Sequence, residues 1–139
     1  MATQNKRVLQ QVGLVLSGLS GLTLLFGTPL MAQASGGGGP RVIAAGACSG
    51  SSDWKLKAKL DNSRLEIEFE VDSNVNGQTW SNVIRDNGTL VFKGNKVTKA
   101  PSGSYTIRKF TANQAGDDVI IARAKNLKTG EVCLGSVTF

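Results

Sequence analysis

The stretch "WKLKAKLDNSRLEIEFEV", residues 54–71, decides the fold of this chain. Apolar side chains alternate with lysines in its first half and with glutamates in its second half. An alternation with a period of two predicts a β-strand that has one buried face. The four residues between the halves, "DNSR", are typical of a turn. The stretch therefore predicts an antiparallel hairpin.

One register of this hairpin satisfies both of its faces. If Leu60 lies opposite Leu65, the apolar residues share one side and three charged pairs share the other, namely Lys55 with Glu70, Lys57 with Glu68 and Lys59 with Glu66. A slip by one residue would place charges in the core. Exposed pairs of this kind contribute about 0.2–1 kcal/mol each, so their main effect is to fix the register. We also expect the lysine strand at a sheet edge, where lysines discourage unwanted pairing.

The rest of the chain continues the pattern of short strands and turns. "DNG", residues 86–88, is the turn of a second hairpin. We prefer a three-residue loop with Gly88 in the left-handed region, which puts Ile84 opposite Leu90, over a two-residue Asn-Gly turn. The expected strands are 53–60, 64–71, 78–85, 89–98, 104–111, 118–126 and 131–139. Seven short strands with turns between them predict an all-β, antiparallel sandwich.

Residues 1–34 have the form of a secretory signal peptide. Two basic residues precede an apolar run over 12–26, and Ala32 and Ala34 form an A-x-A cleavage site. The alternative is an uncleaved membrane anchor, because the apolar segment approaches the ~20 residues that a membrane span needs. Cleavage leaves about 105 residues, enough for one small domain with no stable membrane span. We expect a secreted protein, extracellular or associated with the cell envelope.

The exported part divides into a leader and one domain. "SGGGGP", residues 35–40, begins a flexible linker that we extend over 35–47, and residues 48–139 form the sandwich domain. Exported chains usually pair an even number of cysteines, so Cys48 and Cys133 are expected to form a disulfide. Closing this loop of about 85 residues stabilises the domain by roughly 4–5 kcal/mol. Two free thiols are the alternative.

Two segments carry a resemblance to known sandwiches. Trp80 lies on the third expected strand, and residues 115–130, "AGDDVIIARAKNLKTG", have the alternating pattern of a sixth strand and its turn. The chain resembles the immunoglobulin and fibronectin-III-like β-sandwiches, which implies a seven-stranded fold whose third, sixth and seventh strands share a sheet. The usual disulfide between the second and sixth strands is absent. Residues 48–139 also resemble small uncharacterised secreted proteins of actinobacterial type, which implies export and no particular activity.

The sequence lacks the common signals of catalysis and metal binding. It contains no histidine, both cysteines are expected to be bonded, and no G-x-S-x-G motif surrounds its serines. We therefore predict no enzyme activity, no cofactor and no metal. "VDSNVNGQ", residues 71–78, places oxygen-bearing side chains on alternate positions, so a calcium loop is the alternative, with Asp117 and Asp118 at either the same or the opposite end of the sandwich. The segment lacks the glutamate that position twelve of such a loop requires, because Val83 stands there.

The basic residues are the best indication of a binding surface. If the small and apolar residues of 118–126 point inward, Arg123 and Lys125 point outward, Arg85 joins them from the third strand, and Lys128 lies in the adjoining turn. We hypothesise that this face binds an anionic polymer of the cell envelope or a protein partner, while an ordinary solvated surface is the alternative. Nucleic acid is disfavoured, because no aromatic residues are interleaved with these cations.

The function that the sequence favours is a secreted, non-enzymatic binding or interaction module. A structural or assembly subunit of a cell-envelope complex is the second hypothesis, because open strand edges or the flexible N-terminal segment would join the sandwich to a larger assembly. An enzyme that works without histidine is a distant third.

Overall fold

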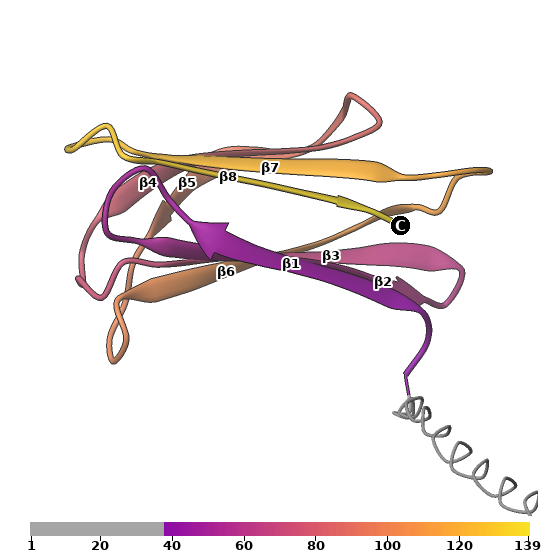
Figure 1. Ribbon diagram of the computed structural model, residues 1–139, viewed down its shortest axis with the longest axis horizontal. Coiled ribbons are helices and arrows are strands. Elements are labelled where there is room, and N and C mark those ends of the chain that lie inside the picture. Colours follow the sequence, from indigo (N-terminus) through magenta and orange to yellow (C-terminus); the bar gives the residue numbers. More distant parts are fainter. Residues whose placement is uncertain (1–37) are drawn as a thin grey trace, which may run out of the picture. The chain divides into compact units, whose positions relative to one another are not determined.

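The computed structural model describes residues 38–139, which fold into two facing antiparallel sheets (Figure 1). The expected signal peptide, residues 1–34, lies outside the described residues. The first sheet has the strand order β1-β2-β3-β6 and the second has the order β5-β4-β7-β8. The strands are β1 (Arg41–Ala47), β2 (Asp53–Asp61), β3 (Arg64–Asp72), β4 (Thr79–Asp86), β5 (Thr89–Val97), β6 (Ser104–Ala112), β7 (Val119–Asn126) and β8 (Val132–Thr138). No helix within residues 38–139 is long and apolar enough to cross a membrane.

The fold has eight strands, not the seven that the sequence predicted. The additional strand, β1, lies within residues 35–47, which we expected to be a linker, and it pairs with β2 from Arg41 to Ala47. The sequence of β1 does not indicate a strand clearly, because its inward positions carry only Val42, Ala44 and Gly46. Gly46 is small for a reason: a Cβ there would lie 3.1 Å from the indole ring of Trp54.

The first hairpin has the register that its sequence predicted. Leu60 lies opposite Leu65, and each of the three lysines of β2 lies opposite its expected glutamate of β3. Most inward residues of both strands, among them Leu56, Ile67 and Phe69, are fully buried in the core, and Trp54 and Leu60 pack against it partly buried. The expectation that β2 is an edge strand was wrong, because β1 covers its free side. The edges of this sheet are β1 and β6.

The second hairpin has a two-residue turn rather than the preferred three-residue loop. Asp86 lies opposite Thr89, and the two residues between them have positive φ angles of 47° and 85°. Asparagine and glycine both tolerate this conformation, which suits the twist of a hairpin. A register shift after Ile84 then leaves one extra residue on β5, so that Ile84 lies opposite Phe92 and Arg85 opposite Leu90. Leu90 therefore faces outward and is 49% exposed.

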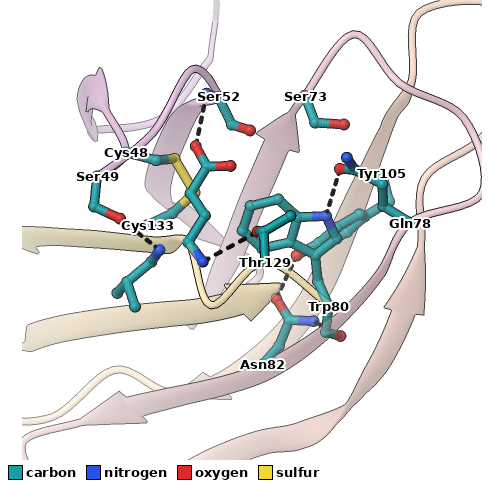
Figure 2. The surroundings of a disulfide bond; sticks show 12 residues. Cys48, Ser49, Ser52, Ser73, Gln78, Trp80, Asn82, Tyr105, Thr129 and Cys133 are labelled. Atoms are coloured by element: carbon teal, nitrogen blue, oxygen red, sulfur yellow. Dashed lines mark hydrogen bonds between the residues drawn. A yellow bond between two sulfur atoms is a disulfide. The ribbon is translucent and has the colours of Figure 1, made fainter. Parts of the chain in front are cut away.

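The predicted disulfide is present and joins the two sheets. Cys48, which follows β1, is bonded to Cys133 in β8, and their Cα atoms lie 4.2 Å apart. The residue after Cys48 strengthens this junction, because the backbone N–H of Ser49 donates to the carbonyl of Val132 over 2.8 Å. Figure 2 shows the disulfide on one side of Trp80 and polar side chains, among them Gln78, Asn82 and Tyr105, around this tryptophan. The start of the domain is thus held against its last strand.

Buried polar side chains near the disulfide are paired with one another. The Tyr105 hydroxyl donates to Oδ1 of Asn82 over 2.7 Å, and Nε1 of Trp80 donates to Oε1 of Gln78 over 3.2 Å (Figure 2). Asn82 is fully buried, and its Nδ2 donates to the Trp80 carbonyl over 2.9 Å. Because the bond between Tyr105 and Asn82 joins β6 to β4, it links the two sheets through the core, in addition to the link at the disulfide.

Candidate binding surface

The outward face of the second sheet brings most of the predicted cationic residues together. Arg85 on β4 and Arg123 and Lys125 on β7 are all exposed on this face. Lys93 on β5 points the same way and was not among the predicted residues. Lys93 follows the half-buried Phe92 along β5, and this alternation could have identified Lys93 from the sequence. We call this face, defined by Arg85, Lys93, Arg123, Lys125 and the outward residues between them, the basic face.

The strand register sets the spacing of these cations. Val83 lies opposite both Lys93 and Arg123, while Arg85 lies opposite Ile121. Arg85 and Arg123 are therefore diagonal neighbours on adjacent strands, roughly 7–8 Å apart. Lys125 follows Arg123 on the same side of β7 at about 7 Å, the distance of two strand residues. Three predicted cations thus form one compact group, with Lys93 two strands away from Arg123.

The cations of the basic face have no acidic neighbours on that face. No outward position of β4, β5, β7 or β8 carries aspartate or glutamate. Arg85 makes a hydrogen bond to the Gly88 carbonyl over 3.0 Å. All five ion pairs among residues 38–139 lie on the other sheet. The positive charge of the basic face is therefore left available for an external anion.

The opposite sheet shows a charge-balanced surface for comparison. Lys59 lies 3.4 Å from Glu66, and both Lys57 and Arg108 pair with Glu68. Burial opposes the ionisation of Glu68, but the hydrogen bonds and charges of Lys57 and Arg108 outweigh it and lower its pKa below the ordinary value. These lysines are occupied by their cross-strand partners, which makes this sheet a poorer anion-binding surface.

The basic face also exposes several large apolar side chains. Residues 38–139 contain nine exposed large apolar residues. Six lie on this face or at its margin, namely Leu90, Val97, Val119, Ile121, Leu127 and Leu134. Leu134 is 59% exposed and lies directly opposite Arg123. Exposed apolar side chains gathered on one face mark interaction sites in many soluble proteins.

The fourth predicted residue, Lys128, lies beside this face rather than on it. It belongs to the turn between β7 and β8, which together with residues 75–79 lines an open pocket of about 630 Å³. Leu127 and Asn126 also line this pocket, and Nδ2 of Asn126 is buried without a hydrogen-bond partner. The pocket adjoins the basic face at Leu127, whose backbone N–H donates to the Thr79 carbonyl over 3.0 Å.

The residues of the alternative calcium hypothesis do not come together. The loop over 71–78 precedes β4, whereas Asp118 lies beyond the other end of β4, within 3.5 Å of the Asn87 side chain. Asp118 instead neighbours the buried Asp86. Within residues 38–139, no group of three or more histidine, cysteine, aspartate or glutamate side chains is arranged to hold a metal ion.

A comparison with known proteins finds no family model and no curated protein that this chain matches. Similarity therefore assigns neither a family nor a function. The strand order, the disulfide and the basic face are the observations from which a function can be inferred.

Proposed function

We propose that this protein is a secreted, non-enzymatic binding module whose basic face contacts an anionic polymer of the cell envelope. The observation that carries the proposal is the group of exposed cations, Arg85, Lys93, Arg123 and Lys125, on one sheet face without a carboxylate among them. A surface with charges of one sign attracts partners of the opposite sign and raises their local concentration. A polymer of phosphates or carboxylates presents repeated anions at spacings that such a face can match.

The proposal includes export and a more specific fold. The disulfide between Cys48 and Cys133 supports export, because such bonds persist in oxidising compartments. The signal peptide over residues 1–34 remains an inference from sequence. The strand orders β1-β2-β3-β6 and β5-β4-β7-β8 are compatible with an immunoglobulin or fibronectin-III-like sandwich to which β1 has been added. A chain without histidine whose two cysteines are bonded to each other also favours binding over catalysis.

Retention on an anionic polymer tests the proposal. The protein is passed over immobilised poly(glycerol phosphate) and eluted with rising NaCl, which screens charge interactions. The double variant Arg123→Ala, Lys125→Ala is expected to elute at lower salt, and its salt dependence to fall by about two ion equivalents, by analogy with nucleic-acid phosphates. Arg41→Ala with Lys55→Ala is the matched control, because it removes two cations from the opposite sheet.

The control double variant is expected to elute close to the unmodified protein. If Arg123→Ala, Lys125→Ala elutes like the unmodified protein, or if the control loses as much retention, the basic face is not the binding surface. Circular dichroism on each variant confirms that the fold is unchanged.

A structural or assembly subunit is the second candidate function. It is favoured by β5 and β8, which are the edges of the second sheet, and by the exposure of Leu134 on β8. Unpaired strand edges can recruit a strand from another copy or another protein. Size-exclusion chromatography over a range of concentrations separates the candidates, because a subunit forms larger species as concentration rises and a binding module stays monomeric.

A further inference from the structure

Cations and aliphatic side chains are interleaved on the basic face. One row across the sheet runs Lys93, Val83, Arg123, Leu134, from β5 to β8. Residues directly opposite one another on adjacent strands have their Cβ atoms about 4.5–5.5 Å apart. Each cation of this row therefore has an aliphatic neighbour at contact distance.

The next row repeats the arrangement with the two kinds of side chain exchanged. Leu90, Arg85 and Ile121 lie side by side on β5, β4 and β7. The exposed fractions of Leu90 and Ile121 are 49% and 46%. A hydrophilic polymer would pair with the cations and leave these aliphatic side chains in water. A partner that satisfies the whole face must carry negative charge and apolar groups together.

A second copy of the chain does not meet this requirement. Two basic faces placed against each other would bring four cations of one copy against four of the other without any carboxylate. Like charges brought together in this way oppose association strongly. The occupant must therefore be of a different chemical nature from the face itself.

We infer that the basic face also binds the surface of an anionic lipid membrane, an inference that rests on the proposed function because it uses the same cations. Arginine and lysine side chains extend toward lipid headgroups while their stems and the neighbouring aliphatic side chains contact the acyl boundary. Each basic residue near an anionic bilayer strengthens partitioning about fivefold. Leu134, Ile121 and Leu90 supply the apolar contact that distinguishes a lipid from a soluble polyanion.

Vesicle co-flotation tests the inference. The protein is mixed with vesicles of equimolar phosphatidylglycerol and phosphatidylcholine, with vesicles of phosphatidylcholine alone, and with soluble poly(glycerol phosphate). Arg123→Ala, Lys125→Ala is expected to weaken binding to the anionic vesicles about 30-fold. Leu134→Ser is expected to weaken it about tenfold and to leave binding to the polymer unchanged.

The apolar variant has a matched control on the other sheet. Ile43 is 55% exposed, close to the 59% of Leu134, and lies on β1. Ile43→Ser is therefore expected to bind anionic vesicles like the unmodified protein. Because both positions are exposed, neither change should impair folding.

The outcomes separate this inference from the proposed function. Binding to the polymer without binding to anionic vesicles overturns the lipid partner and leaves the proposed function standing, with an acidic protein as the next partner to examine. Leu134→Ser that binds vesicles as well as the unmodified protein overturns the inference too. Absence of binding to polymer and vesicles alike refutes both.

Discussion

Removal of the disulfide should destabilise this domain severely. The bond joins residues separated by 85 positions and therefore closes most of the domain into one loop. The chain-entropy relation gives about 4.6 kcal/mol for a loop of this length at room temperature. Small domains have unfolding free energies of about 5–15 kcal/mol, so the loss is a large share of the total. The midpoint of thermal unfolding should fall by about 20–35 °C, at roughly 4–8 °C for each kcal/mol.

Two perturbations remove the bond in different ways and should agree. One is reduction of the unmodified protein, which changes no side-chain volume, and the other is the double variant Cys48→Ala, Cys133→Ala. Urea unfolding followed by tryptophan fluorescence gives the free energy of unfolding in each case, with the oxidised protein as reference. Cys133 is fully buried, so the double variant should lose slightly more than the reduced protein. A loss below about 1 kcal/mol in both would refute the view that this bond holds the two sheets together.

Two further predictions concern buried polar groups. Tyr105→Phe leaves Oδ1 of the fully buried Asn82 without its 2.7 Å hydrogen bond and should cost about 1–3 kcal/mol in urea unfolding, whereas a cost near zero would show that this bond is unimportant. Burial, and then the nearby Asp118 carboxylate, raise the pKa of Asp86 above its ordinary value, so the folded state favours the protonated form. The stability that this group contributes is present in acid and lost as the pH rises through its raised pKa. Asp86→Asn should therefore be more stable than the unmodified protein at neutral pH and nearly equal to it at pH 3, and equal stabilities at neutral pH would contradict this reading.

The sequence predicted those parts of the fold in which two faces constrain the same residues. The β2–β3 hairpin was predicted residue by residue, because its apolar and charged sides are compatible with a single register. Strand β1 was missed, because Val42, Ala44 and Gly46 form an inward face too small to give a strong alternation. That small face is complementary to Trp54, which lies against Gly46, and such a long-range fit is not visible in a local pattern.

The predicted turn of the second hairpin was wrong for a different physical reason. Both possible turns suit the sequence "DNG", and the choice between them depends on a bulge in β5 that local residue preferences do not determine. This difference also changes the candidate site. Leu90 was expected opposite Ile84, but it lies exposed opposite Arg85.

The candidate site itself was predicted in part. Alternation along β7 correctly placed Arg123 and Lys125 outward, and the resemblance to known sandwiches brought Arg85 onto a neighbouring strand. The turn residue Lys128 lies instead beside the pocket at the end of the sheet, because alternation does not extend into turns. The apolar half of the surface was not foreseen, because exposure of Leu134 depends on what covers β8 and not on its own sequence.

Mapping of amide chemical shifts by NMR during addition of poly(glycerol phosphate) tests the central claim most directly. The protein is expected to show its largest shifts at Val83, Arg85, Arg123 and Lys125, with little change along the lysine–glutamate ladder of β2 and β3. Shifts concentrated on that ladder, or no shifts at polymer concentrations that retain the protein on a column, would contradict the assignment of binding to the basic face.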